Sequence, residues 1–342
     1  MPATGRVVII GSWRKDSDDG SKKEQVRVKP RFDVTIAGEL NLDLILYGLP
    51  TELIPETEQL ADDMVLTLGS SSAIVAHNLA SLGGRVGFQS LIGDDPLGQI
   101  ALERLAQSGV DTSRVRRSKS VRTGLSVILQ RKGWRNILTY SGAIARLSFD
   151  DLDLDYLSDA RHFHLSSYYL QANLRPHVPD LFRRLKSAGL TISLDTNHDP
   201  ADRFEDDLRP VLSQVDIFLP NRREACAIVG SDDLEVAMKK LAEIVPLVVV
   251  KLGAEGAAAI RNHKRTERAA LPVKVVDAVG AGDSFDAGFL HAYLNGRSLE
   301  ECMAAGNAAG ALSTTRAGGT EAFRDREHRE SFLRQHTPSL QR

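Results

Sequence analysis

A short glycine-rich stretch near the end of the chain leads directly into a segment of helical periodicity. Gly280, Ala281 and Gly282 have side chains too small to cover the backbone N–H groups. Such groups at a helix N-terminus, with the positive end of the helix dipole, favour an anion such as phosphate. Asp283 follows in the first turn, where N-capping is the commoner role of an aspartate. The combination of an anion cradle and a carboxylate within one turn shifts the balance toward a base that accepts a hydroxyl proton during phosphoryl transfer.

A second carboxylate, Asp277, lies on the strand side of the same loop. It could bind a cation or start the turn, and we favour the cation. These groups need a scaffold that brings a strand, a loop and a helix N-terminus to one edge of a sheet.

The rest of the chain alternates short β-branched runs with longer segments of helical period. This alternation predicts a mostly parallel sheet covered by helices. After a first strand at 33–37, the expected strands are 86–90, 191–194, 217–219 and 247–251, and the expected helices are 98–108, 178–188, 233–244, 283–294 and 299–314.

Two stretches, 43–67 and 123–140, are extended and lack intervening helices. They predict either a small accessory sheet or edge strands of the main sheet. Residues 1–31 hold too little apolar surface to order themselves and are expected to form a tail. The charged segment 323–342 is expected to fray, which leaves 32–322 as the folded domain.

Composition narrows the classes of function. The 342 residues include 43 basic and 45 acidic side chains, so no overall field holds a polyanion, and nucleic acid is not expected as the main partner. Two cysteines, Cys226 and Cys302, give no disulfide framework and fit a reducing, cytoplasmic setting. No apolar run reaches the ~20 residues that span a bilayer. The histidines lack metal-ligand spacing, and core or pocket packing is favoured over metal binding for His162 and His164, which alternate on an expected strand.

The segment 277–285 resembles the C-terminal signature of the ribokinase-like, or PfkB, carbohydrate kinase family. Further resemblances follow in the family's order, at 93–98, 105–115, Asn221-x-x-Glu224 and 249–256. Together they cover about 32–322. The resemblance implies a three-layer α/β/α domain with a mostly parallel central sheet, and a β-sheet lid formed by the two extended stretches.

Carried over residue by residue, the resemblance implies a role for each matching position. Asp283 would be the catalytic base and the amides of Gly280, Ala281 and Gly282 the anion hole. Asn221 and Glu224 would organise Mg²⁺, in part through water. The nucleotide would be bordered by Lys251, Gly253, Gly256 and Asn307, and a K⁺ ion by Asp277, Val279 and the loop from Ser313 to Gly318. The chain has no Gly-Lys-Ser/Thr element, so a Walker loop is excluded.

On the acceptor side, Asn41 and Asp43 resemble the residues that bind sugar hydroxyls, with Gly69 and Ser70 beside them; a turn residue is the alternative for Asp43. Ile74 stands where relatives commonly carry an asparagine. Its loss implies a different hydroxyl pattern, a less polar acceptor or compensation by nearby serines or His77. Arg135 resembles a lid position but could equally be a solvated hairpin tip.

These residues together predict an ATP-dependent phosphotransferase that acts on an alcohol group, with a primary hydroxyl of a sugar or sugar derivative as the acceptor. A nucleoside kinase of the same family is the first alternative. A catalytically silent sugar-binding or partner-binding relative is the second. A homodimer through the lid strands is a further expectation. The acceptor, the hydroxyl that is phosphorylated, the regulation and the role of residues 1–31 stay open at this point.

Overall fold

The computed structural model describes residues 29–131, 134–204 and 208–337. The expected N-terminal tail lies mostly outside the described residues. The strands are β1 (Phe32–Ala37), β2 (Leu42–Tyr47), β3 (Asp63–Leu68), β4 (Val86–Gly93), β5 (Asp111–Ser118), β6 (Leu125–Arg131), β7 (Trp134–Tyr140), β8 (Ala160–Leu165), β9 (Thr191–Leu194), β10 (Ile217–Phe218), β11 (Leu247–Lys251), β12 (Ala257–Arg261) and β13 (Lys264–Arg268).

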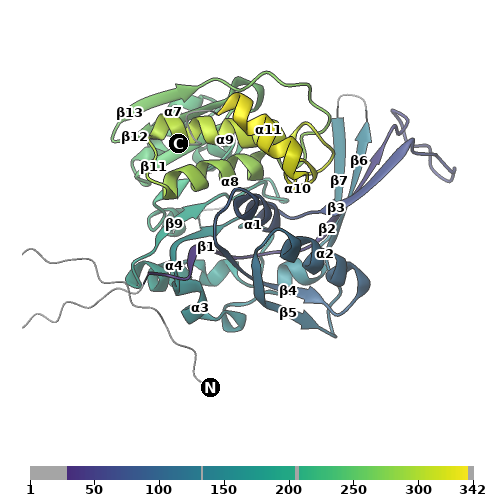
Figure 1. Ribbon diagram of the computed structural model, residues 1–342, viewed down its shortest axis with the longest axis horizontal. Coiled ribbons are helices and arrows are strands. Elements are labelled where there is room, and N and C mark those ends of the chain that lie inside the picture. Colours follow the sequence, from purple (N-terminus) through teal and green to yellow (C-terminus); the bar gives the residue numbers. More distant parts are fainter. Residues whose placement is uncertain (1–28, 132–133, 205–207, 338–342) are drawn as a thin grey trace, which may run out of the picture.

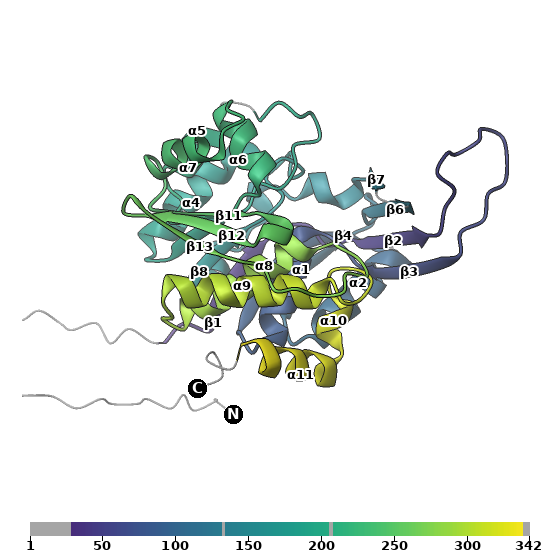
Figure 2. The same cartoon turned by 90° about the horizontal axis from the view of Figure 1, so that it is seen from above.

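The α-helices are α1 (Ser71–Ser81), α2 (Pro96–Gln107), α3 (Leu154–Ser158), α4 (Val178–Ser187), α5 (Leu208–Leu212), α6 (Arg222–Val229), α7 (Leu234–Ala242), α8 (Ala281–Leu294), α9 (Leu299–Ser313), α10 (Glu321–Arg324) and α11 (Arg326–His336). Figures 1 and 2 show them on both sides of a central sheet. None of the helices in the described part of the chain has the length and apolar character needed to cross a bilayer.

The central sheet has nine strands among the described residues, in the order β13-β12-β11-β10-β9-β8-β1-β4-β5. Its pairs from β11 to β5 are parallel, and β12 and β13 add an antiparallel edge. The expectation of a mostly parallel sheet covered by helices is confirmed. Parallel strands all end at one edge of the sheet, so the loops that follow them meet there.

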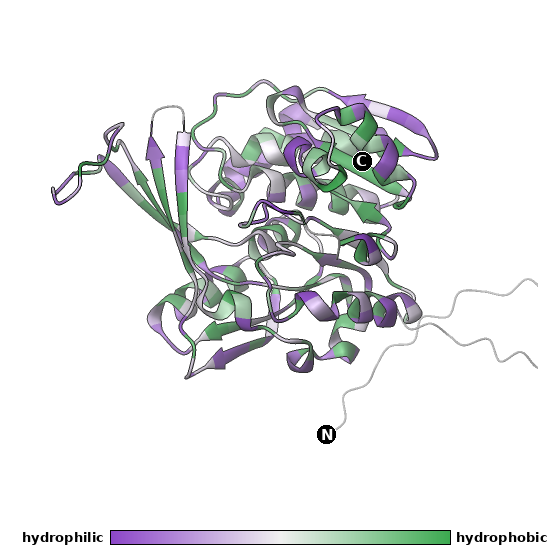
Figure 3. Ribbon diagram, turned by 180° about the vertical axis from the view of Figure 1, so that it is seen from behind, coloured by the Kyte–Doolittle hydropathy of each residue, from purple (hydrophilic) through white to green (hydrophobic). Residues whose placement is uncertain are grey.

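Alternate residues of each strand face opposite sides, which divides the core in two. Val248 and Val250 of β11 pack with helices α3, α4, α5, α6 and α7, whereas Leu247 and Val249 pack with α1, α2, α8 and α9. Because both of its faces are covered, β11 is apolar along almost its whole length (Figure 3). The result is a three-layer α/β/α arrangement.

The extended stretches form a separate sheet of four strands, in the order β3-β2-β6-β7, and are not edge strands of the main sheet. β2 pairs with β6 in parallel, and the outer pairs are antiparallel. Figure 1 shows this sheet projecting away from the body. Its base is anchored where Ile45 and Ile128 pack against Val279, while every residue of β7 is exposed.

The C-terminal segment differs from its expectation, because residues 326–336 form helix α11 instead of a fraying tail. Asp325 caps this helix by accepting a hydrogen bond from His328 N at 3.0 Å. Phe323 and Phe332 are buried against Ala309 and Leu312 of α9. Although the sequence of this segment is highly charged, it contains one apolar stripe, and this stripe packs the segment against the main domain.

Candidate active site

The loop before α8 adopts a conformation that only glycine accommodates easily. Gly280 is the N-cap of α8 with a φ of 70°, and a Cβ on it would lie 2.6 Å from the Cα of Gly319. Asp277 ties the loop down, since its Oδ1 accepts from Val279 N at 3.0 Å and its Oδ2 from Gly318 N at 3.1 Å. Gly280, Ala281 and Gly282 all line a cavity of about 740 Å³.

Asp283 lies on the wall of this cavity, with only 7% of its surface exposed. It does not cap α8, because Gly280 is the N-cap and no side chain bonds there. The N-cap alternative is therefore wrong. Burial raises the pKa of Asp283, and the negative charge of Asp195 raises it further, against the opposing effects of Lys251, Ser71 and Asn197. Asn197 Nδ2 donates to Asp283 Oδ1 at 3.4 Å.

Lys251 sits between two buried carboxylates at the end of β11. Its Nζ donates to Asp195 Oδ2 at 2.6 Å and to the Asp286 carboxylate at 3.1 and 3.2 Å. Burial alone would lower the pKa of Lys251, but the charges of Asp195 and Asp286 raise it. Burial also raises the pKa of Asp286 and the negative charge of Asp195 adds to this, against the opposing charge of Lys251. Lys251 is thus a fixed cation beside Gly282, whose added Cβ would be 3.6 Å from Nζ.

Asn221 and Glu224 form a reciprocal capping box at the start of α6. Glu224 N donates to Asn221 Oδ1 at 3.0 Å, and Asn221 N and Nδ2 donate to the Glu224 carboxylate at 2.9 and 2.6 Å. Glu224 is nevertheless on the cavity wall. Burial, followed by the charge of Asp195, raises its pKa to about 7.

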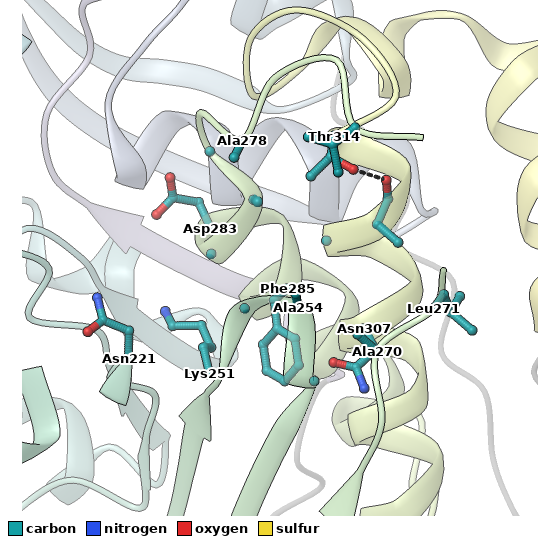
Figure 4. Close-up of a pocket in the computed structure, with 18 of the residues that line it drawn as sticks. Asn221, Lys251, Ala254, Ala270, Leu271, Ala278, Asp283, Phe285, Asn307 and Thr314 are labelled. Carbon is teal, nitrogen blue, oxygen red and sulfur yellow. Dashed lines mark hydrogen bonds between the residues drawn. The ribbon is translucent and has the colours of Figure 1, made fainter. Parts of the chain in front are cut away.

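Apolar residues form the other end of the cavity. Figure 4 shows Asn221, Lys251 and Asp283 toward one end and Ala270 and Leu271 toward the other. Gly253, Gly256 and Asn307 line it as well. Asn307 Nδ2 donates to the carbonyl oxygens of Arg268 and Ala269 at 3.0 Å, which holds the segment after β13 against α9. An apolar slot that ends in a lysine cation and an anion loop suits a nucleotide.

The expected acceptor residues lie together but outside this cavity's lining. A Cβ on Gly69 would be 2.2 Å from Asp43 Oδ1 and 3.0 Å from Asn41 Nδ2, so glycine makes room for both side chains. Asp43 is buried, and burial followed by the charges of Asp283 and Asp277 raises its pKa to about 7. Ser70 Oγ donates to the carbonyl oxygen of Glu39 at 2.9 Å.

Ile74 is buried against the anion loop, because Cβ atoms on Gly280 and Gly319 would meet its Cδ1 at 3.1 and 2.7 Å. Relatives commonly carry an asparagine at the position of Ile74, and in this chain an asparagine lies one helical turn later, at position 78. Asn78 Nδ2 donates to Ser284 Oγ and to Gly319 O, both at 3.0 Å. Among the nearby serines, Ser71 bonds Asp283 and Ser72 bonds Glu39.

Sequence reasoning left out several residues of this edge of the sheet. Asp195, Asn197 and Asp286 were given no role from the sequence. Tyr47 was also missed: its hydroxyl donates to Asp277 Oδ2 at 2.9 Å and links the small sheet to the anion loop. The one available signal was position, since Asp195 directly follows β9 at the edge where parallel strands end. Arg135 of β7 joins the cavity lining.

His162 and His164 are part of a buried hydrogen-bonded chain. The two rings bond Thr191, Ser193 and Ser166 at 2.7 Å. Among the described residues, no three His, Cys, Asp or Glu side chains converge on a point that could hold a metal ion.

The chain has a three-layer α/β fold, and a buried carboxylate, an anion loop and a nucleotide-sized cavity lie at the ends of its parallel strands. This combination defines a class of proteins, the α/β kinases that act on alcohol groups. The chain belongs to the pfkB family of carbohydrate kinases, whose family model matches residues 31–326. It is 32% identical over 247 residues to an uncharacterized sugar kinase of Archaeoglobus fulgidus, covering 72% of this chain and 97% of the relative.

It is also 32% identical over 279 residues to the 2-dehydro-3-deoxygluconokinase of Bacillus subtilis, covering 78% of this chain and 86% of the relative. The solved structure of Arabidopsis thaliana ribokinase with ribose and ATP is similar with a TM-score of 0.75 and 26% identity, covering 88% of this chain and 98% of that one. The ribokinase-like fold is therefore confirmed, while these relatives differ in the substrates that their names give.

Proposed function

We propose that this protein transfers the γ-phosphoryl group of ATP to a primary hydroxyl of a sugar or sugar derivative, with Asp283 as the catalytic base. The observation that carries the proposal is the position of Asp283. It is a buried carboxylate that caps nothing, in the first turn of the helix whose N-terminus forms the anion loop. Its raised pKa suits proton acceptance better than that of a solvated carboxylate.

The reaction then follows from the groups around Asp283. The acceptor oxygen attacks the γ-phosphorus, its proton passes to a carboxylate oxygen of Asp283, and the bond to the bridging oxygen of ADP breaks. Loop N–H groups from Gly280 to Gly282, and the nearby Lys251 ammonium, offset charge that develops on the transferring group. Asn197 keeps the carboxylate oriented. The apolar end of the cavity holds the base of the nucleotide.

Mg²⁺ fits the chain through Glu224. Both carboxylate oxygens of Glu224 already accept hydrogen bonds from Asn221. Their remaining lone pairs suit a Mg²⁺ ion that would be held through water by this one carboxylate, together with the phosphates. When bound, Mg²⁺ neutralises charge on the β- and γ-phosphates.

For K⁺ we propose the loops that contain Asp277, Val279, Ser313 and Gly318. Ser313 Oγ is buried and has no hydrogen-bond partner among the described residues, which leaves an oxygen for a cation. The Asp277 carboxylate supports these loops by accepting from two of their N–H groups.

For the acceptor we propose Asn41, Asp43, Gly69 and Ser70, with the small sheet as a lid. Two observations favour this assignment: the negative charge of Asp283 helps to raise the pKa of Asp43, and Tyr47 joins the small sheet to the anion loop. Carboxylate and amide oxygens beside each other accept well from vicinal hydroxyls. Ile74 packs onto the anion loop, so a less polar acceptor such as a nucleoside does not follow from it.

The test is a coupled ADP-release assay with Mg-ATP and K⁺ on pentoses, hexoses, sugar acids, sugar phosphates and nucleosides. We expect activity on one sugar class, and a loss of about 10²–10⁴-fold in Asp283→Asn, because this is the contribution of a general base. Asp180→Asn is the matched control, since Asp180 is an exposed carboxylate in the first turn of another helix. Activity on nucleosides alone, or ligand binding without ADP release, would contradict the proposal, as would a near-normal rate in Asp283→Asn.

We also propose a cytoplasmic setting and a homodimer. Cys226 and Cys302 are both free thiols, which fits a reducing compartment. Met64, Ile137 and Leu138 of the small sheet are exposed and apolar, which fits burial against a second copy. Sedimentation of the wild type and of Ile137→Asp tests the dimer, and an unchanged molecular mass in the variant would contradict it.

A further inference from the structure

A second cavity lies on a different part of the surface, between helix α1 and the C-terminal segment that ends in α11. Its volume is about 640 Å³, and it shares no lining residue with the active-site cavity. Four arginines and two carboxylates line it: Arg316, Arg324, Arg326, Arg329, Glu321 and Asp325. His77 of α1 lines it too and is neutral, because burial lowers its pKa to about 4.

The two carboxylates are already paired. Asp325 Oδ2 lies 2.5 Å from Arg316 Nη2, and Glu321 is shared between Arg324 at 3.0 Å and Arg104 at 3.6 Å. The four lining arginines against two lining carboxylates leave a net charge of +2 on the cavity wall. A cavity with this charge attracts an anion.

Arg329 is the most unusual member of this wall. It is half-buried, its Nη1 donates to the carbonyl oxygen of Phe323, and no carboxylate of the described residues forms an ion pair with it. The other arginine of this turn, Arg326, pairs outward with Glu330. A half-buried guanidinium without an anionic partner is costly unless a ligand supplies one. Its planar donors match the oxygens of a phosphate group.

Hydrogen bonds connect this wall to the anion loop of the active site. His77 Nδ1 bonds Asn78 Oδ1 at 2.8 Å, and Asn78 Nδ2 donates to Ser284 Oγ at 3.0 Å. Ser284 Oγ donates in turn to the carbonyl oxygen of Gly280 at 2.7 Å.

A second connection runs through Glu321, which accepts from Thr67 Oγ1 of β3 at 2.8 Å. Thr67 lies at the base of the small sheet, directly beside Gly318. A ligand that draws Arg324 away from Glu321 therefore acts on the base of that sheet.

We propose that this second cavity binds a small organic phosphate ester, and that its occupancy changes the activity at the anion loop. The phosphate group lies against Arg329 and the neighbouring arginines of the wall. The organic part occupies the remaining volume, which is within the size range of small-ligand pockets. The site goes beyond the proposed catalytic function, because it uses none of the residues that contact ATP or the acceptor.

Binding is measured by calorimetry on the full chain with the active site filled by Mg²⁺ and a non-hydrolysable ATP analogue. The probes are inorganic phosphate, ribose 5-phosphate and AMP, with ribose and adenosine as their unphosphorylated counterparts. We expect at least one organic phosphate to bind and its counterpart not to bind. Stronger binding of ribose 5-phosphate or of AMP distinguishes a sugar phosphate from a nucleotide. Binding by none of the phosphates, or equal binding by the counterparts, overturns the proposal.

Arg329→Gln should weaken binding at least tenfold. Arg334→Gln is the matched control, since Arg334 lies on the same helix but outside the cavity lining and should leave binding unchanged. Arg316→Gln is the second variant in case Arg329→Gln does not fold. Equal affinity in the folded arginine variants overturns the site. In ADP-release assays the bound phosphate should change kcat/KM at least twofold in the wild type and not in Arg329→Gln, and an unchanged kcat/KM in the wild type overturns the coupling.

Discussion

Replacing Asp43 by asparagine should make the ligand-free protein more stable at neutral and alkaline pH. Burial, followed by the charges of Asp283 and Asp277, raises the pKa of Asp43 from its ordinary value of 3.8 to about 7. Between these pH values the folded chain keeps a proton that the unfolded chain has released. The wild type therefore loses stability as pH rises through this window, and the loss is complete above about pH 8.

The size of the effect follows from the change in pKa. A difference of about three pKa units corresponds to about 4 kcal/mol of unfolding free energy, which is an upper limit. Asparagine keeps the shape and one acceptor oxygen but carries no charge. The stability gained by Asp43→Asn relative to the wild type should thus grow by about 2.5 kcal/mol between pH 5 and pH 8, and stay constant above pH 8.

Urea unfolding of both proteins at half-unit steps from pH 5 to pH 9 measures this difference. Asp62→Asn is the control, because Asp62 is an exposed carboxylate beside the same small sheet. The variant should also raise the KM for the acceptor about 10–100-fold, because a hydrogen bond to a charged group contributes about 1.5–3 kcal/mol. If the stability difference did not change with pH, this would refute the argument that burial of the charged Asp43 carboxylate lowers the free energy of unfolding.

Three further tests, with four substitutions, probe the site. Lys251→Met leaves two buried carboxylates without their cation and should destabilise the fold by about 3–5 kcal/mol in urea unfolding; a loss under about 1 kcal/mol would contradict the pairing. Gly280→Ala should cost about 1–3 kcal/mol because of its positive φ, whereas Gly282→Ala fits beside Lys251 and should reduce ADP release with little change in stability; equal stability losses would contradict this contrast. Glu224→Gln should raise the Mg²⁺ concentration for half-maximal rate at least tenfold. In the wild type that concentration should rise as pH falls through about 7, where the Glu224 carboxylate takes up a proton, and an unchanged Mg²⁺ requirement would oppose the role of Glu224.

Much of the fold could be predicted from the sequence because local pattern decides local structure. Strands 191–194 and 247–251 are found where the β-branched runs placed them, and the helices expected at 283–294 and 299–314 start and end within about two residues of their predicted bounds. The order of the motifs was sufficient to identify the family, since a glycine loop, an Asn-x-x-Glu pair and a turn after a strand are all local features of the sequence. The C-terminal helix was missed because its apolar stripe becomes visible only where Phe323 and Phe332 meet α9.

The sequence alone determined which residues are able to do chemistry: small residues that expose N–H groups, a following aspartate, and a lysine at the end of a strand. Tertiary structure decided what each of them does, because their partners are distant along the chain. Asp195 is 56 residues from Lys251 in sequence, and Asn197 is 86 residues from Asp283. Only folding removes Asp283 from water, which raises its pKa, and only folding brings Asp195 and Asp286 to Lys251, where their charges keep the lysine a cation beside the anion loop.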